Sequence, residues 1–206
     1  MFKKEYEVIK EFVKKPWRKF TFKEIKTLSG KKSESYVYVS LKKFVALGIL
    51  NEEKAGNVIL YNLNLSLVKT WVYTGIIAEH MGWNKKGFPY ADLERFLSKI
   101  SLNFFIFVIT GSYANGTYNK KSDIDIVIIC DDNIDTKKIY SELRYASDMN
   151  IPKIHLYVFK KSEFLAMLLH KEENYGKEIA RNNIILFGGS EYYKIMAEAI
   201  KNGFIG

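Results

Sequence analysis

The sequence predicts an α+β protein with two folded parts, an N-terminal group of helices followed by a β-hairpin and a C-terminal mixed sheet. In residues 1–65, three amphipathic helical patterns come before two short alternating runs. In residues 91–206, short β-branched and aromatic runs alternate with helical stretches, as in α/β and α+β sheets. The chain has 206 residues, of which 48% are apolar, so it can bury real cores. We expect domains at 1–65 and 91–206, joined by a linker helix and loop at 66–90.

The positive charge is concentrated at the N-terminal end. The formal net charge is +9, and residues 1–65 carry most of it, with 14 Lys and Arg against 7 Asp and Glu. A local basic excess is typical of a surface that meets a polyanion, although a solvated basic face gives the same count.

Neither the composition nor the start of the chain suggests a membrane or secreted protein. The longest apolar run is too short to span a bilayer, and residues 1–5 do not look like a secretory start. The one cysteine, Cys130, excludes an internal disulfide framework and is expected to be a small core residue. We therefore expect a cytoplasmic protein that does not bind membranes.

Three helices and a hairpin are expected in residues 1–65. Thr21 and Glu24 fit a capping box, and Ser33 fits an N-cap, so each marks a helix start. Pro16 and Gly48 are breakers that end the first and third helices. The expected helices lie at 5–14, 21 to about 30, and 33 to about 47, and the expected strands at 49–53 and 58–63.

This order of elements resembles a winged helix-turn-helix domain. The resemblance implies that the third helix reads the major groove of DNA and that the hairpin forms the wing. No Arg, Gln or Asn on that helix suits bidentate base readout, so phosphate contacts would dominate. The alternative is a module that docks a protein or a second copy. The candidate DNA-binding residues are Ser35, Tyr36, Tyr38, Lys42, Lys43 and, on the wing, Lys54.

The C-terminal part is organised around residues 104–130. An apolar run at 104–110 predicts a buried strand, which Gly111-Ser112 ends. A short helical segment at 113–118 and a polar turn then lead to a second strand at 123–130. A helix at 66–81 is expected to bridge the domains, a loop to follow at 82–89, and a helix at 90–100 to open the C-terminal domain.

Asp123 and Asp125 are the most informative residues of this stretch. Side chains at i and i+2 of a strand share a face, so both carboxylates point the same way while Ile124 and Ile126 point into a core. Two adjacent carboxylates repel each other unless a cation or a proton relieves the charge. Mg²⁺ is commonly held by one or two carboxylates together with substrate phosphates.

Gly111 and Ser112 complete the pattern. A glycine lets backbone approach closely, and a helix that starts beside Ser112 offers free N–H groups to a phosphate. A phosphate-binding site close to a metal-binding site indicates a nucleotide site. The alternative is an ordinary Gly-Ser turn and an exposed strand start.

Gly111-Ser112, ten residues, and then Asp123-Ile124-Asp125 resembles the signature of the DNA polymerase beta-like nucleotidyltransferase superfamily, and most of all its minimal nucleotidyltransferase branch. The resemblance covers about 91–206. It implies a nucleoside triphosphate with Mg²⁺ and transfer of a nucleoside monophosphate to a hydroxyl. Mn²⁺ is the alternative ion, because it accepts an imidazole such as that of His155 more readily than Mg²⁺ does. The acceptor would be a small molecule or a partner protein, as in toxin–antitoxin pairs.

The sequence departs from the family at the third catalytic position. Relatives carry an acidic residue on the neighbouring strand, and here that position aligns with His155. The histidine could ligate a metal or act as a base, the enzyme could work weakly with one well-held metal, or the site could bind nucleotide without turnover. Asn115 stands where many relatives have arginine, and Lys120 and Lys121 could supply phosphate charge instead, unless they are merely solvated.

The remaining C-terminal elements are expected as a helix at 135–147, a strand at 154–159, a helix capped by Ser162 and running to about 169, a Lys- and Glu-rich helix to about 181, and a last helix at 190–201. The interpretation is a metal-dependent nucleotidyltransferase with catalytic residues Asp123, Asp125 and His155. The alternatives are a DNA-binding regulator whose nucleotidyltransferase domain only senses nucleotide, and an inert interaction scaffold.

Overall fold

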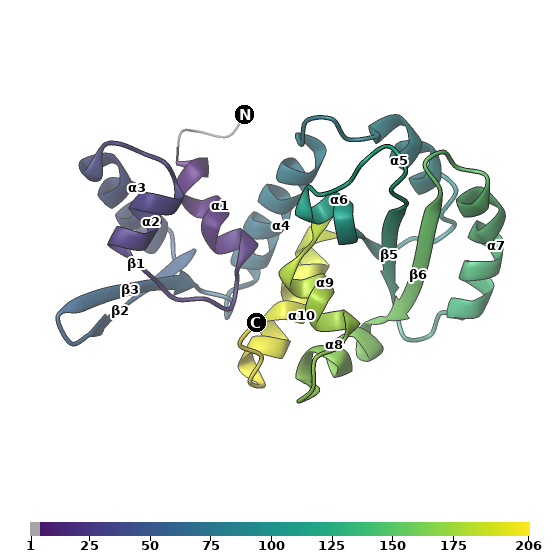
Figure 1. Cartoon of the computed structure of the whole chain (residues 1–206). Coiled ribbons are helices and arrows are strands. Elements are labelled where there is room, and N and C mark those ends of the chain that lie inside the picture. Colours follow the sequence, from purple (N-terminus) through teal and green to yellow (C-terminus); the bar gives the residue numbers. More distant parts are fainter. Residues whose placement is uncertain (1–4) are drawn as a thin grey trace.

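A computed structural model describes residues 5–206, in which an N-terminal lobe and a larger C-terminal lobe lie on either side of a long helix (Figure 1). Among these residues, no helix is both long enough and apolar enough to cross a membrane.

The N-terminal lobe contains three helices and a small antiparallel sheet. Thr21 and Glu24 form the predicted capping box, and the Ser33 hydroxyl accepts the N–H of Tyr36, so both predicted helix starts are confirmed. The short strand β1 was not expected, because two residues are too few to show alternation. The strands are ordered β1-β3-β2. The elements are α1 (Tyr6–Lys14), β1 (Phe20–Thr21), α2 (Phe22–Leu28), α3 (Glu34–Ala46), β2 (Leu50–Ala55) and β3 (Val58–Leu63). Their interpretation as a winged helix-turn-helix remains a prediction.

The long helix α4 (Val68–Trp83) runs two residues further than the bridging helix that we expected. It packs on α1 of one lobe and on α10 (Gly189–Lys201) of the other. A Cβ built on Gly75 would lie 2.3 Å from the backbone nitrogen of Ser190, so only glycine allows the two helices to approach this closely. The predicted loop therefore begins after α4, at Asn84, and not at Gly82.

The C-terminal lobe is built on a mixed four-stranded sheet, as predicted. Its order is β6-β5-β4-β7, with β5 and β6 parallel and the other pairs antiparallel. The strands are β4 (Phe105–Thr110), β5 (Ile124–Cys130), β6 (Ile154–Lys160) and β7 (Ile184–Phe187). Cys130 is fully buried, which confirms its prediction as a core residue.

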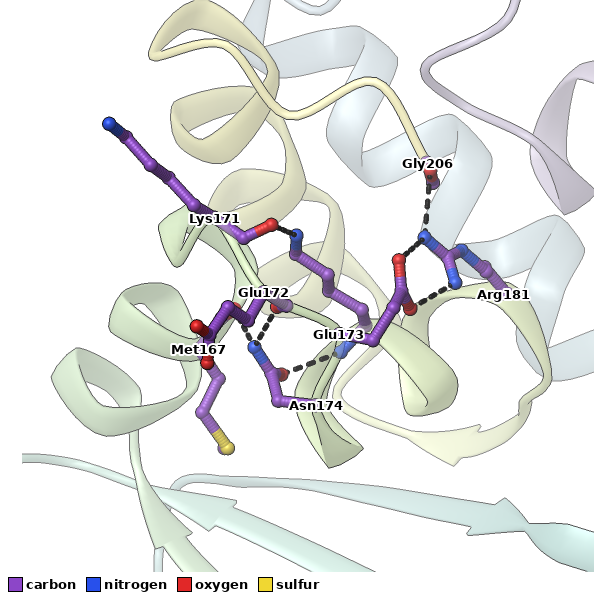
Figure 2. Close-up of polar contacts among 8 residues, drawn as sticks. Met167, Lys171, Glu172, Glu173, Asn174, Arg181 and Gly206 are labelled. Carbon is purple, nitrogen blue, oxygen red and sulfur yellow. Dashed lines mark hydrogen bonds and ion pairs between the residues drawn. The ribbon is translucent and has the colours of Figure 1, made fainter.

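Helices cover both faces of this sheet. One face packs on α4, α8 (Lys161–Leu169), α9 (Tyr175–Arg181) and α10, and the other on α5 (Tyr90–Leu97) and α7 (Thr136–Asp148). The helix α5 is shorter than predicted. The helix α8 begins before Ser162, which therefore lies in its first turn and is not its N-cap. Asn174 provides the N-cap of α9 and ties the preceding loop to Met167 (Figure 2).

The two lobes share one continuous hydrophobic core on the α4 side of the sheet. The buried Tyr193 hydroxyl of α10 donates a 2.7 Å hydrogen bond to the carbonyl of Val13 at the end of α1. The rings of Trp17 and Phe204 also meet edge to face, with centroids 5.4 Å apart. The N-terminal lobe is thus packed against the C-terminal helices and is not simply tethered to them.

Candidate active site

The two predicted aspartates lie at the beginning of β5. Ile124 and Ile126 are fully buried in the core on the α5 and α7 side of the sheet. Because side chains alternate along a strand, Asp123 and Asp125 point to the opposite face, and both remain partly exposed. The two carboxylates therefore share one face of the sheet, as predicted.

His155 faces both carboxylates. It is the register partner of Asp125 in the parallel pair of β5 and β6. Its Nε2 lies 3.2 Å from Oδ2 of Asp123, and its Nδ1 lies 3.5 Å from Oδ1 of Asp125. The imidazole ring thus bridges the two aspartates.

Gly111 lies against the other side of Asp125. Its φ is +64°, and a Cβ built on it would sit 2.1 Å from Oδ2 of Asp125. Thr110, the last residue of β4, is the register partner of Asp125. The short helix α6 (Gly111–Asn115) therefore starts directly beside this carboxylate, and its first N–H groups have no partner within the helix.

The loop between α4 and α5 holds α6 in place. The Lys85 ammonium donates to the carbonyls of Tyr113 and Ala114, at 3.0 and 3.1 Å, and the Tyr118 hydroxyl donates to the carbonyl of Gly87. Burial lowers the pKa of Lys85. Sequence reasoning missed this residue, because a lysine in a polar loop looks the same whether it is solvated or bound to carbonyls.

Asn182, at the end of α9, ties that helix to the same turn. Its side-chain nitrogen donates to the Gly111 carbonyl at 3.3 Å, and its own carbonyl accepts the Thr110 hydroxyl at 2.8 Å. No local signal marks this asparagine, which becomes a site residue only because α9 folds back onto the sheet.

The fold raises the pKa of Asp125. Burial raises its pKa, His155 opposes this effect, and the charges of Asp123 and Glu178 reinforce it. Glu178 lies on α9, and sequence reasoning did not single it out. The site therefore gathers negative charge from two elements beside one imidazole.

This donor set suits a divalent cation. The aspartate oxygens are hard ligands of the kind that Mg²⁺ and Mn²⁺ prefer, and an imidazole nitrogen favours Mn²⁺ over Mg²⁺. A cation would also offset the burial and the carboxylate repulsion that raise the pKa of Asp125. In the described part of the chain, no group of three or more His, Cys, Asp or Glu side chains is already arranged around a metal position. The His155 ring contacts both carboxylates directly, so it would have to turn for all three groups to share an ion.

Lys120 and Lys121 lie in the exposed turn before β5, where the Asn119 side chain accepts the N–H of Lys121. Within residues 5–206, neither lysine side chain has a hydrogen bond or an ion pair to a carboxylate. The structure does not bring them to Asp123 or Asp125, and their proposed contact with phosphate awaits a test.

Of the candidate DNA-binding residues, Lys42 and Lys43 are already paired with carboxylates. Lys42 lies 2.6 Å from Glu52 on β2, and Lys43 lies 2.7 Å from Glu5. Both pairs are partly exposed and contribute little stability, but they reduce the free positive charge on α3.

The other candidates differ in exposure. Ser35, Tyr38 and Lys54 are exposed, as expected for an outward surface. Tyr36 is not: it packs against the core and its hydroxyl is buried, which corrects the expectation that it faces outward. Its position on the helix lies directly before the buried Val37, at the edge of the apolar stripe.

Comparison with known proteins matches part of the C-terminal lobe to one family. Residues 93–190 match the family model described as "Nucleotidyltransferase domain", and this range contains Gly111, both aspartates and His155. The match shows a nucleotidyltransferase domain over slightly less than half of the chain, and the minimal nucleotidyltransferase branch stays a prediction. A solved structure described as "Crystal structure of the toxin-antitoxin with AMP-PNP" is similar at 15% sequence identity and a TM-score of 0.40, over 55% of this chain and 87% of that one. A search of curated proteins gives no match.

Proposed function

We propose that the protein is a metal-dependent nucleotidyltransferase that moves a nucleoside monophosphate from a nucleoside triphosphate to a hydroxyl acceptor. The observation that carries the proposal is the contact of Gly111 with Asp125, because it joins a phosphate-binding turn to a pair of carboxylates. The match of residues 93–190 to the nucleotidyltransferase domain supports it.

In this proposal, each group at the site has one task. The N–H groups at the start of α6 bind the triphosphate, with Ser112 beside them and Lys120 and Lys121 adding charge from the turn. Asp123 and Asp125 would hold Mg²⁺ or Mn²⁺, which supplies neutralisation of phosphate charge when bound.

The reaction makes one bond and breaks one. The acceptor oxygen forms a bond to the α-phosphorus, the bond from that phosphorus to the β-phosphate oxygen breaks, and pyrophosphate leaves with the bonding electrons. The acceptor hydroxyl must lose its proton. His155 is the proposed base, because its neutral imidazole can take a proton and it lies within 3.5 Å of both carboxylates.

Titration calorimetry with ATP and Mn²⁺ or Mg²⁺ tests the binding step. We expect Asp123→Asn and Asp125→Asn to abolish metal-dependent nucleotide binding. Asp131→Asn is a matched control, since Asp131 follows the other end of β5 and pairs with Lys161. Incubation of the protein with α-labelled nucleoside triphosphates, metal and cell lysate tests the transfer step. Equal affinity in the wild type and both site variants would refute the proposal.

A nucleotide sensor is the second candidate, and one observation favours it. Both ring nitrogens of His155 lie against the carboxylates that would hold the ion, so the ring occupies the space between them and must turn before a metal can bind there. A sensor would bind nucleotide and transfer nothing with either metal. In that case the N-terminal lobe would act as a DNA-binding or docking module that responds to nucleotide.

A further inference from the structure

The helix α4, which lies between the two lobes, exposes aliphatic side chains on its outward face (Figure 1). Its four exposed residues are Val68, Lys69, Val72 and Ile76. The three aliphatic residues among them are 63%, 44% and 50% exposed, in chain order. A helix at a protein surface normally carries polar residues on the side that faces water. The outward face of α4 therefore differs from an ordinary solvated helix surface.

The inward face of α4 is filled mainly by small residues. It packs on α1, α10 and β7, and a Cβ built on Gly75 would already collide with the backbone of α10. Burial of the exposed aliphatic residues thus needs a partner, because the rest of the described chain leaves them in water. The buried residues of α4 are Thr70, Thr74, Gly75, Ile77, Ala78 and Gly82, of which only Ile77 is a large aliphatic residue.

One cation and one carboxylate flank the aliphatic residues. The α4 stripe consists, in order, of Lys69, Val72, Ile76 and Glu79, whose spacings of three, four and three residues place them along one side of the helix. Oε1 of Glu79 accepts the N–H of Gly189 at 2.7 Å. Within residues 5–206, neither Lys69 nor Glu79 forms an ion pair. The stripe therefore has a positive end, an apolar middle and a negative end.

This stripe is complementary to itself when two copies lie antiparallel. A two-fold axis at the level of residue 74, midway along the stripe, would set Val72 against the partner's Ile76 and Lys69 against the partner's Glu79. Parallel helices would instead bring the two lysines together and the two glutamates together, which is unfavourable. The arrangement of charge thus favours a second copy of this chain as the occupant and an antiparallel orientation.

We infer that the α4 stripe is a dimer interface, in which two copies of the chain pack antiparallel through Val72 and Ile76 with a Lys69–Glu79 pair on each side. This inference goes beyond the proposed transferase function and does not depend on it, because no residue of the candidate active site lies on α4. The interface would join the two chains at the helix that connects their lobes.

Sedimentation equilibrium of the full chain over a range of concentrations tests the inference. We expect a reversible equilibrium between monomer and dimer for the wild type. Val72→Asp should weaken the dimer by at least about a hundredfold, because each copy would place a carboxylate in the apolar centre of the interface. Tyr145→Asp is the matched control: it replaces an exposed aromatic residue of α7 and should leave the dissociation constant unchanged.

Charge reversal tests the register of the two helices. In Lys69→Glu, the new carboxylate would face the partner's Glu79 and should weaken the dimer by roughly five- to thirtyfold. Adding Glu79→Gln should recover most of the lost affinity, because glutamine removes the repulsion and keeps an oxygen for the N–H of Gly189. Lys23→Glu is the matched control, since it reverses an exposed charge on α2 and should change nothing.

A wild type that stays monomeric at every concentration would overturn the inference and would leave a different protein as the occupant of the stripe. A dimer that Val72→Asp does not weaken, or one that Lys69→Glu affects no more than Lys23→Glu, would overturn it as well, because its contacts would lie elsewhere. Circular dichroism checks that each variant is folded. Calorimetry with ATP and Mn²⁺ reports on the transferase proposal separately, so either proposal can fail without the other.

Discussion

The Cα of Gly111 faces the Asp125 carboxylate so closely that a methyl group on it would lie 2.1 Å from Oδ2. The turn that would bind phosphate and the residue that would bind metal are therefore fixed to each other by direct contact.

Gly111→Ala tests this contact. The positive φ alone is expected to cost about 1–2 kcal/mol of stability. Gly116→Ala is the matched control, because Gly116 ends the same helix at φ +75° with no heavy atom within 4 Å of its built Cβ. We expect a larger loss of stability and of ATP–metal affinity for Gly111→Ala, measured by urea unfolding and calorimetry. Equal effects of the two changes would show that contact with Asp125 does not matter.

Asp125→Asn should stabilise the protein near neutral pH. The folded-state pKa of Asp125 is raised, first by burial and then by Asp123 and Glu178, against the opposing effect of His155. The ionised carboxylate thus destabilises the fold above that pKa, and protonation relieves this as the pH falls through it. The advantage of the variant should therefore shrink toward acid pH. Urea unfolding between pH 4 and 8 measures this difference in stability, and repeating the pair on a His155→Gln background removes the imidazole contact from the comparison. A pH-independent difference would contradict the raised pKa.

His155 should make Mn²⁺ the better activator. Mn²⁺ accepts an imidazole ligand more readily than Mg²⁺ does. His155→Asp would supply a third carboxylate at the register position beside Asp125 and should raise Mg²⁺-supported transfer. The ratio of Mn²⁺ to Mg²⁺ activity in the labelled-nucleotide assay gives the answer. A sensor would show no transfer with either ion in the wild type.

Lys85 should stabilise α6 through its two carbonyl contacts. We expect Lys85→Met to cost about 1–3 kcal/mol, because the carbonyls of Tyr113 and Ala114 lose a charged donor in a partly buried contact. Lys86→Met, one residue away on an exposed side chain, should stay within about 0.5 kcal/mol of the wild type. Thermal unfolding followed by circular dichroism compares the two. If both variants melt together, Lys85 does not anchor the helix.

If the N-terminal lobe binds DNA, Lys54 should matter more than Lys42. Lys42 is paired with Glu52, whereas Lys54 has no ion pair within the described residues. Gel shifts with the full chain at two salt concentrations should show weaker binding for Lys54→Ala across DNA sequences and a small effect for Lys42→Ala. Lack of binding at low salt would favour a docking role for this lobe.

Much of the fold could be predicted because its signals are local. The capping box of Thr21 and Glu24 depends on residues that are three apart in the sequence. In the predicted strand 123–130, the alternation of polar and apolar residues at its start indicates which side chains point to the core. For the same reason, the sequence alone indicated that Asp123 and Asp125 share a face. It also predicted a short helix here, but at 113–118, whereas α6 begins at Gly111 and ends at Asn115.

The remaining contacts of the candidate site depended on which helices and strands pack together. His155 meets the aspartates only because β6 lies parallel to β5 in a register that sets His155 opposite Asp125. Lys85, Glu178 and Asn182 reach the site from helices and loops that are distant in sequence. Tyr36 packs against a core whose members come from both lobes. Sequence periodicity tells which side of its own element a residue occupies, whereas its neighbours across space are set by the packing of the whole chain.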